Sequence, residues 1–169
     1  MAVGVAAAGL VALLLFFASR DSSTFQGAAG PGQAFPDQGH QHLASANAGR
    51  RFAYDSNPPT SGPHLPLLPA GDARPLSTDE LLQALEVGDV ALVYGDRRLE
   101  PALRRLASNL AGPYSRSLAA AGQAVLLDFQ RGQRGVVAVA WRHLLRTSGS
   151  ADPRLQGFIQ FWLGRGAGA

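Results

Sequence analysis

The pattern of hydrophobic residues predicts three helices in the second half of the chain. Ser77 and Glu80 form a capping box at the start of an apolar run that ends at Gly88, and this arrangement predicts the first helix. Apolar residues recur at helical spacing over 99–110, which predicts the second. The third is predicted over 152–163, where an Asp-Pro pair suits a helix N-terminus. Each helix therefore has one apolar face to bury against a core.

Short runs rich in β-branched residues lie between these helices and predict strands at 90–94, 124–129 and 136–141. The long helical connection between the first two strands favours a parallel pair. A short polar turn with two glycines joins the last two, which favours an antiparallel hairpin. The predicted fold class is therefore α/β (α+β), a small three-stranded mixed sheet packed with about three helices.

An uncharged apolar run from Ala2 to Ala18 opens the sequence. As a helix rising about 1.5 Å per residue it is near the lower limit for crossing a bilayer. A cleaved signal peptide is the alternative, but no basic segment precedes the run. We therefore expect a transmembrane anchor at 1–20, with the membrane as a partner. Arg20 and Asp21 cancel, so local charge does not set its orientation.

The chain between this run and the first predicted helix has no sustained hydrophobic period and is rich in Gly, Pro, Ala, Ser and Gln. We expect 21–38 to be a flexible linker. A single globular domain is expected at 39–165, because the chain has room for one core. Within it, 39–76 is predicted to be an irregular, loop-rich segment and 77–165 the α/β core.

Composition excludes several classes of function. The chain has no cysteine, so disulfides, thiolate metal sites and cysteine catalysis are ruled out. All 15 basic residues are arginines, and the net charge is only +3. No aromatic residues are interleaved with these arginines in a nucleic-acid motif, so we expect no nucleic-acid partner.

The segment 57–64 is a rigid, proline-rich loop that ends in a histidine. Its three prolines fix φ and lack an N–H, and Gly62 permits backbone angles closed to other residues. Two more histidines, His40 and His42, alternate upstream, so an extended chain would point both to one side. Convergence with His64 would form a metal site, because imidazole is the commonest metal ligand. Alternatively, the upstream stretch is simply polar, and His64 bonds to a backbone carbonyl.

Tyr54 followed by Pro-Pro-Thr-Ser-Gly-Pro-His at 58–64 resembles the signature of a bacterial family known only as domain of unknown function 3105. The resemblance extends to the final helix. It implies a single-pass protein in the cell membrane with its domain outside the cytoplasm. It also implies two histidines on the first helix, where this chain has Gln83 and Val87.

These observations leave three functional hypotheses. The leading one is a non-enzymatic binding or interaction module without a cofactor, in which Tyr54, Ser61 and His64 bind an unknown protein or small ligand. The alternative, which rests on the resemblance, is a copper or zinc protein with His42, His64 and Glu86 as metal ligands. A distant alternative is a serine hydrolase centred on Ser61, which lacks the strand-turn-helix setting of a nucleophile elbow.

Overall fold

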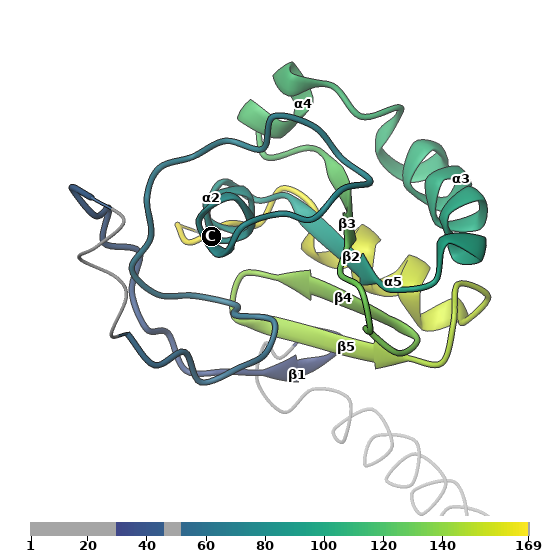
Figure 1. Cartoon of the computed structure of the whole chain (residues 1–169), viewed down its shortest axis with the longest axis horizontal. Helices are drawn as coiled ribbons and strands as arrows, with labels where there is room; N and C mark the ends of the chain where they lie inside the picture. Colours follow the sequence, from purple (N-terminus) through teal and green to yellow (C-terminus); the bar gives the residue numbers. More distant parts are fainter. Residues whose placement is uncertain (1–29, 46–51, 169) are drawn as a thin grey trace, which may run out of the picture.

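The computed structural model describes residues 30–45 and 52–168 and confirms the mixed α and β fold class. The described residues form a five-stranded sheet between helices (Figure 1). The predicted anchor at 1–20 and the first half of the predicted linker, 21–29, lie outside these residues. Within the described part of the chain, no helix is long and apolar enough to span a bilayer.

The sheet is mixed, and its strand order is β1-β5-β4-β2-β3. As predicted, the two strands joined by the helical connection, β2 and β3, pair in parallel. On its other side β2 pairs antiparallel with β4, and β4 pairs antiparallel with β5. The strands are β1 (Gln33–Ala34), β2 (Val90–Tyr94), β3 (Val125–Phe129), β4 (Val136–Ala140) and β5 (His143–Thr147).

The predictions of three strands and of a hairpin between β3 and β4 were wrong. β4 forms its hairpin with β5 instead, through a turn in which Arg142 has φ 61°. A non-glycine residue in this left-handed region gives no turn signal in the sequence. The connection after β3 crosses the end of β2, where Gln130 N–H donates to the Tyr94 carbonyl (2.8 Å). Gly95 permits this crossing, because a Cβ there would lie 2.4 Å from the Gln133 carbonyl oxygen.

β1 is the second strand that the sequence did not reveal. It lies inside the predicted flexible linker and pairs with the edge strand β5. Two residues are too few to show an alternating pattern, so this strand depends on the sheet edge that it covers. Phe35 N–H continues the contact by donating to the Arg142 carbonyl (2.8 Å).

The helices cover both faces of the sheet, which explains why every residue of β2 is buried (Figure 1). Val90, Leu92 and Tyr94 face the layer of α3 and α5, whereas Ala91 and Val93 face α2. The three predicted helices are confirmed, and the short α4 was not predicted. Their bounds are α2 (Thr78–Val87), α3 (Glu100–Ala111), α4 (Arg116–Ala120) and α5 (Pro153–Trp162), with a 3-10 turn η1 (Arg97–Leu99).

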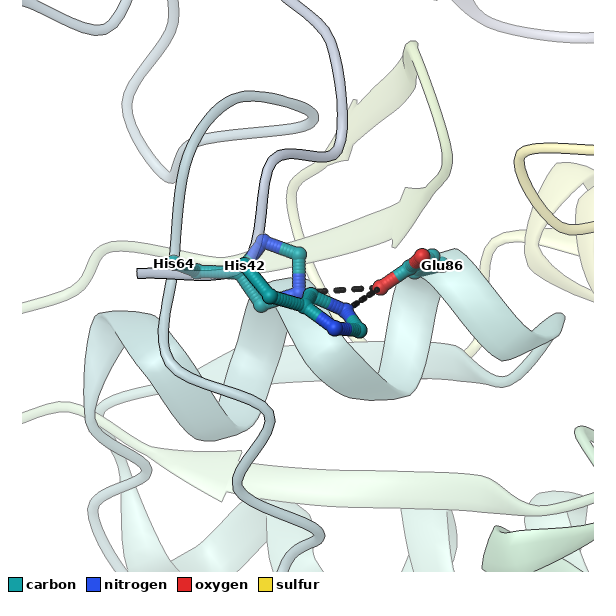
Figure 2. A group of neighbouring side chains, drawn as sticks. All are labelled: His42, His64 and Glu86. Carbon is teal, nitrogen blue, oxygen red and sulfur yellow. Dashed lines mark hydrogen bonds and ion pairs between the residues drawn. The ribbon is translucent and has the colours of Figure 1, made fainter. Parts of the chain in front are cut away.

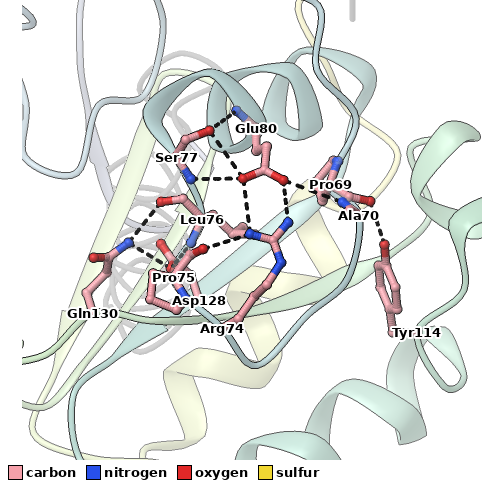
Figure 3. A network of polar contacts seen from close by, with 10 residues as sticks. All are labelled: Pro69, Ala70, Arg74, Pro75, Leu76, Ser77, Glu80, Tyr114, Asp128 and Gln130. Carbon is pink, nitrogen blue, oxygen red and sulfur yellow. Dashed lines mark hydrogen bonds and ion pairs between the residues drawn. The ribbon is translucent and has the colours of Figure 1, made fainter.

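Polar contacts hold the end of the irregular segment against α2 and β3 (Figure 3). Arg74 forms an ion pair with Glu80 of α2, and its hydrogen bonds lower the pKa of Glu80 to about 2. Leu76 N–H donates to the buried Asp128 carboxylate of β3 (2.9 Å). The Tyr114 hydroxyl donates to the Pro69 carbonyl (2.8 Å). These contacts supply partners for backbone groups that no regular element satisfies.

The proline-rich loop is also fixed by backbone groups. The Tyr54 hydroxyl donates to the Pro63 carbonyl (2.7 Å), and Gly62 N–H donates to the Gly39 carbonyl (2.7 Å). Leu65 N–H donates to Asp79 at the start of α2 (2.8 Å). The loop is therefore anchored on both sides of its histidine.

Replacing Gly62 by alanine should loosen this loop. Gly62 has φ 124°, and a Cβ there would lie 2.8 Å from Cε1 of Tyr54. We expect Gly62→Ala to lower the free energy of unfolding by about 1–3 kcal/mol, measured by urea denaturation. Gly71→Ala is the matched control, because nothing lies within 4 Å of a Cβ at that position. Equal stability of the two variants would contradict this account.

Asp89 should make the protein less stable as the pH rises. Its side chain is 1% exposed and accepts a hydrogen bond from Ala124 N–H (2.7 Å), and burial raises its pKa to about 7. The folded state therefore binds this proton more tightly than the unfolded state does, and stability falls between about pH 4 and about pH 7.

Asp89→Asn keeps the acceptor for Ala124 and removes the titration. Its free energy of unfolding should match the parent's near about pH 4 and exceed it by about 2–4 kcal/mol at about pH 8. Asp55→Asn makes the same change at an exposed position and serves as the matched control. A difference between Asp89→Asn and the parent that does not change with pH would refute the assignment.

Candidate functional site

Two extended segments run side by side and bring two histidines together. Leu43 N–H donates to the His64 carbonyl (2.8 Å), and His64 N–H donates to the Gln41 carbonyl (3.1 Å). These bonds form an isolated parallel bridge between His42 and His64. Residues that face each other in such a bridge point their side chains to the same side. The two imidazole rings are consequently neighbours, with centroids 5.4 Å apart.

Glu86 meets both histidines from the last turn of α2 (Figure 2). Its Oε2 atom lies 2.9 Å from His42 Nε2 and 3.0 Å from His64 Nε2. One potential ligand atom from each of the three residues lies within 4.8 Å of the others. The structure thus brings together the three residues that the sequence predicted as metal ligands, which come from three separate parts of the chain.

The hydrogen bonds of His64 orient its ring toward Glu86. Nδ1 lies 2.9 Å from the Gly62 carbonyl oxygen, which only accepts, so Nδ1 carries a proton. A neutral ring then has its lone pair on Nε2, facing the lone pairs of the Glu86 carboxylate at 3.0 Å. This contact is favourable only if a proton or another cation lies between the two groups. An Nδ1–H bonded to a backbone carbonyl is the usual arrangement of a histidine that ligates metal through Nε2.

The cluster runs from the interior to the surface. The side chain of His64 is 0% exposed, that of Glu86 15% and that of His42 48%. A solute can therefore reach the cluster from the His42 side. The last turn of α2 has no basic residue, so the carboxylate adds to the partial negative charge of the helix C-terminus. Both features favour a cation at this position.

Gln83 lies one helical turn before Glu86 and is 7% exposed. Its Nε2 atom is 3.5 Å from Glu86 Oε2, and its Oε1 atom has no hydrogen-bond partner among the described residues. In the sequence, Gln83 is notable only because it occupies a position where the family resemblance implies a histidine. Its spacing of three residues from Glu86 was the signal that both side chains share one face of α2.

The other residues singled out by the sequence have internal partners. His40 does not join His42, because its ring packs edge-on against Trp141. The Tyr54 hydroxyl bonds within the loop, as described above, and its ring packs on Phe52. Ser61, which the sequence predicts as a ligand-binding residue, is 0% exposed in the structure.

Ser61 also lacks the surroundings of a catalytic nucleophile. Its hydroxyl donates to the Pro36 carbonyl (3.3 Å) and accepts from Gln38 N–H (3.0 Å). Both ring nitrogens of His64 are engaged elsewhere, so His64 does not act as a base toward this serine.

Comparison with known proteins supports the resemblance noted in the sequence. No curated protein and no solved structure matches the chain significantly. A family model described as "Protein of unknown function (DUF3105)" matches residues 45–168. This match includes His64 and Glu86, whereas His42 lies just before it. Because the match spans most of the sequence, the chain belongs to the DUF3105 family.

Proposed function

We infer that the protein is a binding module for a divalent metal ion, held by His42, His64 and Glu86. The observation that carries this proposal is the convergence of their ligand atoms within 4.8 Å. The proline-rich loop then has a structural task, since it holds the buried His64 in place. Recognition of a partner by exposed loop side chains is less well supported, because Thr60, Ser61 and His64 are fully buried.

The geometry of the cluster suits a metal with bonds of about 2.0–2.2 Å to nitrogen and oxygen. Ligand atoms around a tetrahedral ion with such bonds are separated by about 3.3 Å. The two nitrogen-to-oxygen distances of 2.9 and 3.0 Å are within a few tenths of an ångström of that value. Small rotations of the His42 and Glu86 side chains, neither of which is fully buried, would therefore open the cluster enough to admit an ion.

The donor set selects the kind of metal. Two imidazoles and one carboxylate suit zinc and copper(II), whereas a soft ion such as copper(I) prefers sulfur ligands. Such a three-residue set leaves coordination positions for water or for a small ligand. Within the cluster, His64 supplies a fixed nitrogen, Glu86 supplies negative charge, and His42 closes the site from the solvent side.

The proposed location is the cell membrane, with the domain outside the cytoplasm. The apolar run at 2–18 supports an anchor, and the family resemblance supports this orientation. A metal site on an anchored domain would then meet ions that arrive from outside the cell.

Metal binding can be tested by calorimetric titration of the purified full-length chain with zinc and with copper(II). We expect the parent to bind one equivalent, and His42→Ala and Glu86→Gln to reduce its affinity on the order of 100-fold. Affinity should also fall as the pH is lowered, because protons compete with the metal for the imidazole nitrogens.

His40→Ala is the matched control, since it removes a neighbouring histidine that contacts Trp141 instead of the cluster. It should bind like the parent. His42 is half exposed, so its replacement should leave the fold intact. A parent chain that binds neither metal would rule out this function.

The proposed orientation predicts that protease added to intact cells will digest the domain. Residues 30–168 should be cleaved in cells that express the full-length chain, while a cytoplasmic marker protein stays intact. Protection of the domain until the cells are lysed would show that it faces the cytoplasm.

A further inference from the structure

The buried amide of Gln83 is not satisfied by the protein in either of its two orientations. With Nε2 toward Glu86, the amide donates weakly over 3.5 Å, and its oxygen has no partner among the described residues. A turn of the amide by 180° exchanges the two atoms. It would then place two oxygens 3.5 Å apart and leave the buried NH₂ group in the position that lacks a partner.

An unpartnered buried amide oxygen is costly, because it has lost its hydrogen bonds to water without replacement. Buried polar groups of this kind in native proteins usually indicate a water molecule, an ion or a functional constraint. The amide of Gln83 lies against the carboxylate of Glu86, with 3.5 Å between Nε2 and Oε2. A cation bound beside Glu86 would also give the unpartnered oxygen of Gln83 a partner.

We propose that the Oε1 atom of Gln83 is a fourth protein ligand to the metal ion held by His42, His64 and Glu86. This assignment rests on the proposed function. It turns a three-residue site into one with two nitrogen and two oxygen donors from the protein. Gln83 and Glu86 come from one helix at a spacing of three residues, and the histidines come from the two bridged segments, so the four donors approach from two sides.

Two neutral nitrogens, one neutral oxygen and one carboxylate give this site a single negative charge. A divalent ion is therefore favoured, and the net charge with the ion bound is +1. The absence of sulfur among these donors disfavours copper(I). Cobalt(II) is a suitable spectroscopic probe, because its visible absorption depends on the number and kind of its ligands.

A different role for Gln83 is to position Glu86 by donating a hydrogen bond from Nε2. The two roles predict opposite effects of Gln83→Glu. A carboxylate at position 83 supplies an oxygen donor, so a ligand role keeps or raises the affinity for zinc. It removes the N–H donor and sets two negative charges side by side, so a positioning role lowers the affinity.

The experiment compares the full-length parent, Gln83→Leu and Gln83→Glu, each titrated with zinc alone and with cobalt(II) alone. We expect Gln83→Leu to bind zinc at least about tenfold more weakly and to change the spectrum of saturated cobalt. Without metal, Gln83→Leu should be at least as stable as the parent, because a buried unpartnered group is removed. Gln83→Glu should bind zinc as tightly as the parent or more tightly. Gln156→Leu, at an exposed helical glutamine, is the matched control.

The outcomes separate this inference from the proposed function. Parent-like affinity and cobalt spectrum in Gln83→Leu, together with weak binding by His42→Ala, would exclude Gln83 as a ligand and keep the metal site. Weak binding by Gln83→Glu would assign the positioning role and overturn the ligand role. A parent that binds neither zinc nor cobalt would remove both proposals. Gln83→Met, which keeps the length of the side chain, serves if Gln83→Leu does not fold.

Discussion

Carboxylates along one helix hold the irregular first part of the domain to its core. Asp79 accepts a backbone N–H from the proline-rich loop, and Glu80 pairs with an arginine of the following segment. Glu86 meets the two histidines at the other end of the helix. The irregular segment offers few apolar side chains to the core, so its position depends on these polar contacts. Without α2, neither histidine would have the carboxylate that its Nε2 atom contacts.

The two ends of α2 differ in how their charges are compensated. At the N-terminus, the capping box and the acidic residues meet free backbone N–H groups, and an arginine neutralises Glu80. At the C-terminus, Glu86 adds negative charge to a helix end that has no basic residue in its last turn. The acidic residues at the N-terminus of α2 therefore stabilise the structure, whereas Glu86 at its C-terminus lies beside the two imidazoles.

Local signals made the three longer helices predictable, whereas the sheet depended on distant contacts. The capping box at Ser77 and the Asp152-Pro153 pair specify helix starts within a few residues. The pairing of β4 with β5 instead of β3 follows from a turn at Arg142 and from the passage of the chain over Gly95, and neither leaves a pattern in the sequence. The metal-ligand set required the family resemblance, because only the folded chain shows that His42 and His64 are in register.

The contacts of Glu86 with the two histidines also affect the conformational entropy of the chain. Glu86 is 22 residues from His64 and 44 residues from His42, so its contacts close two long loops at one point. The free energy required to close a loop grows only slowly with its length, so both closures together cost little more than short ones. A bond stronger than a hydrogen bond at this point would act as a reversible cross-link, and it would do so in a chain that has no cysteine to form a permanent one.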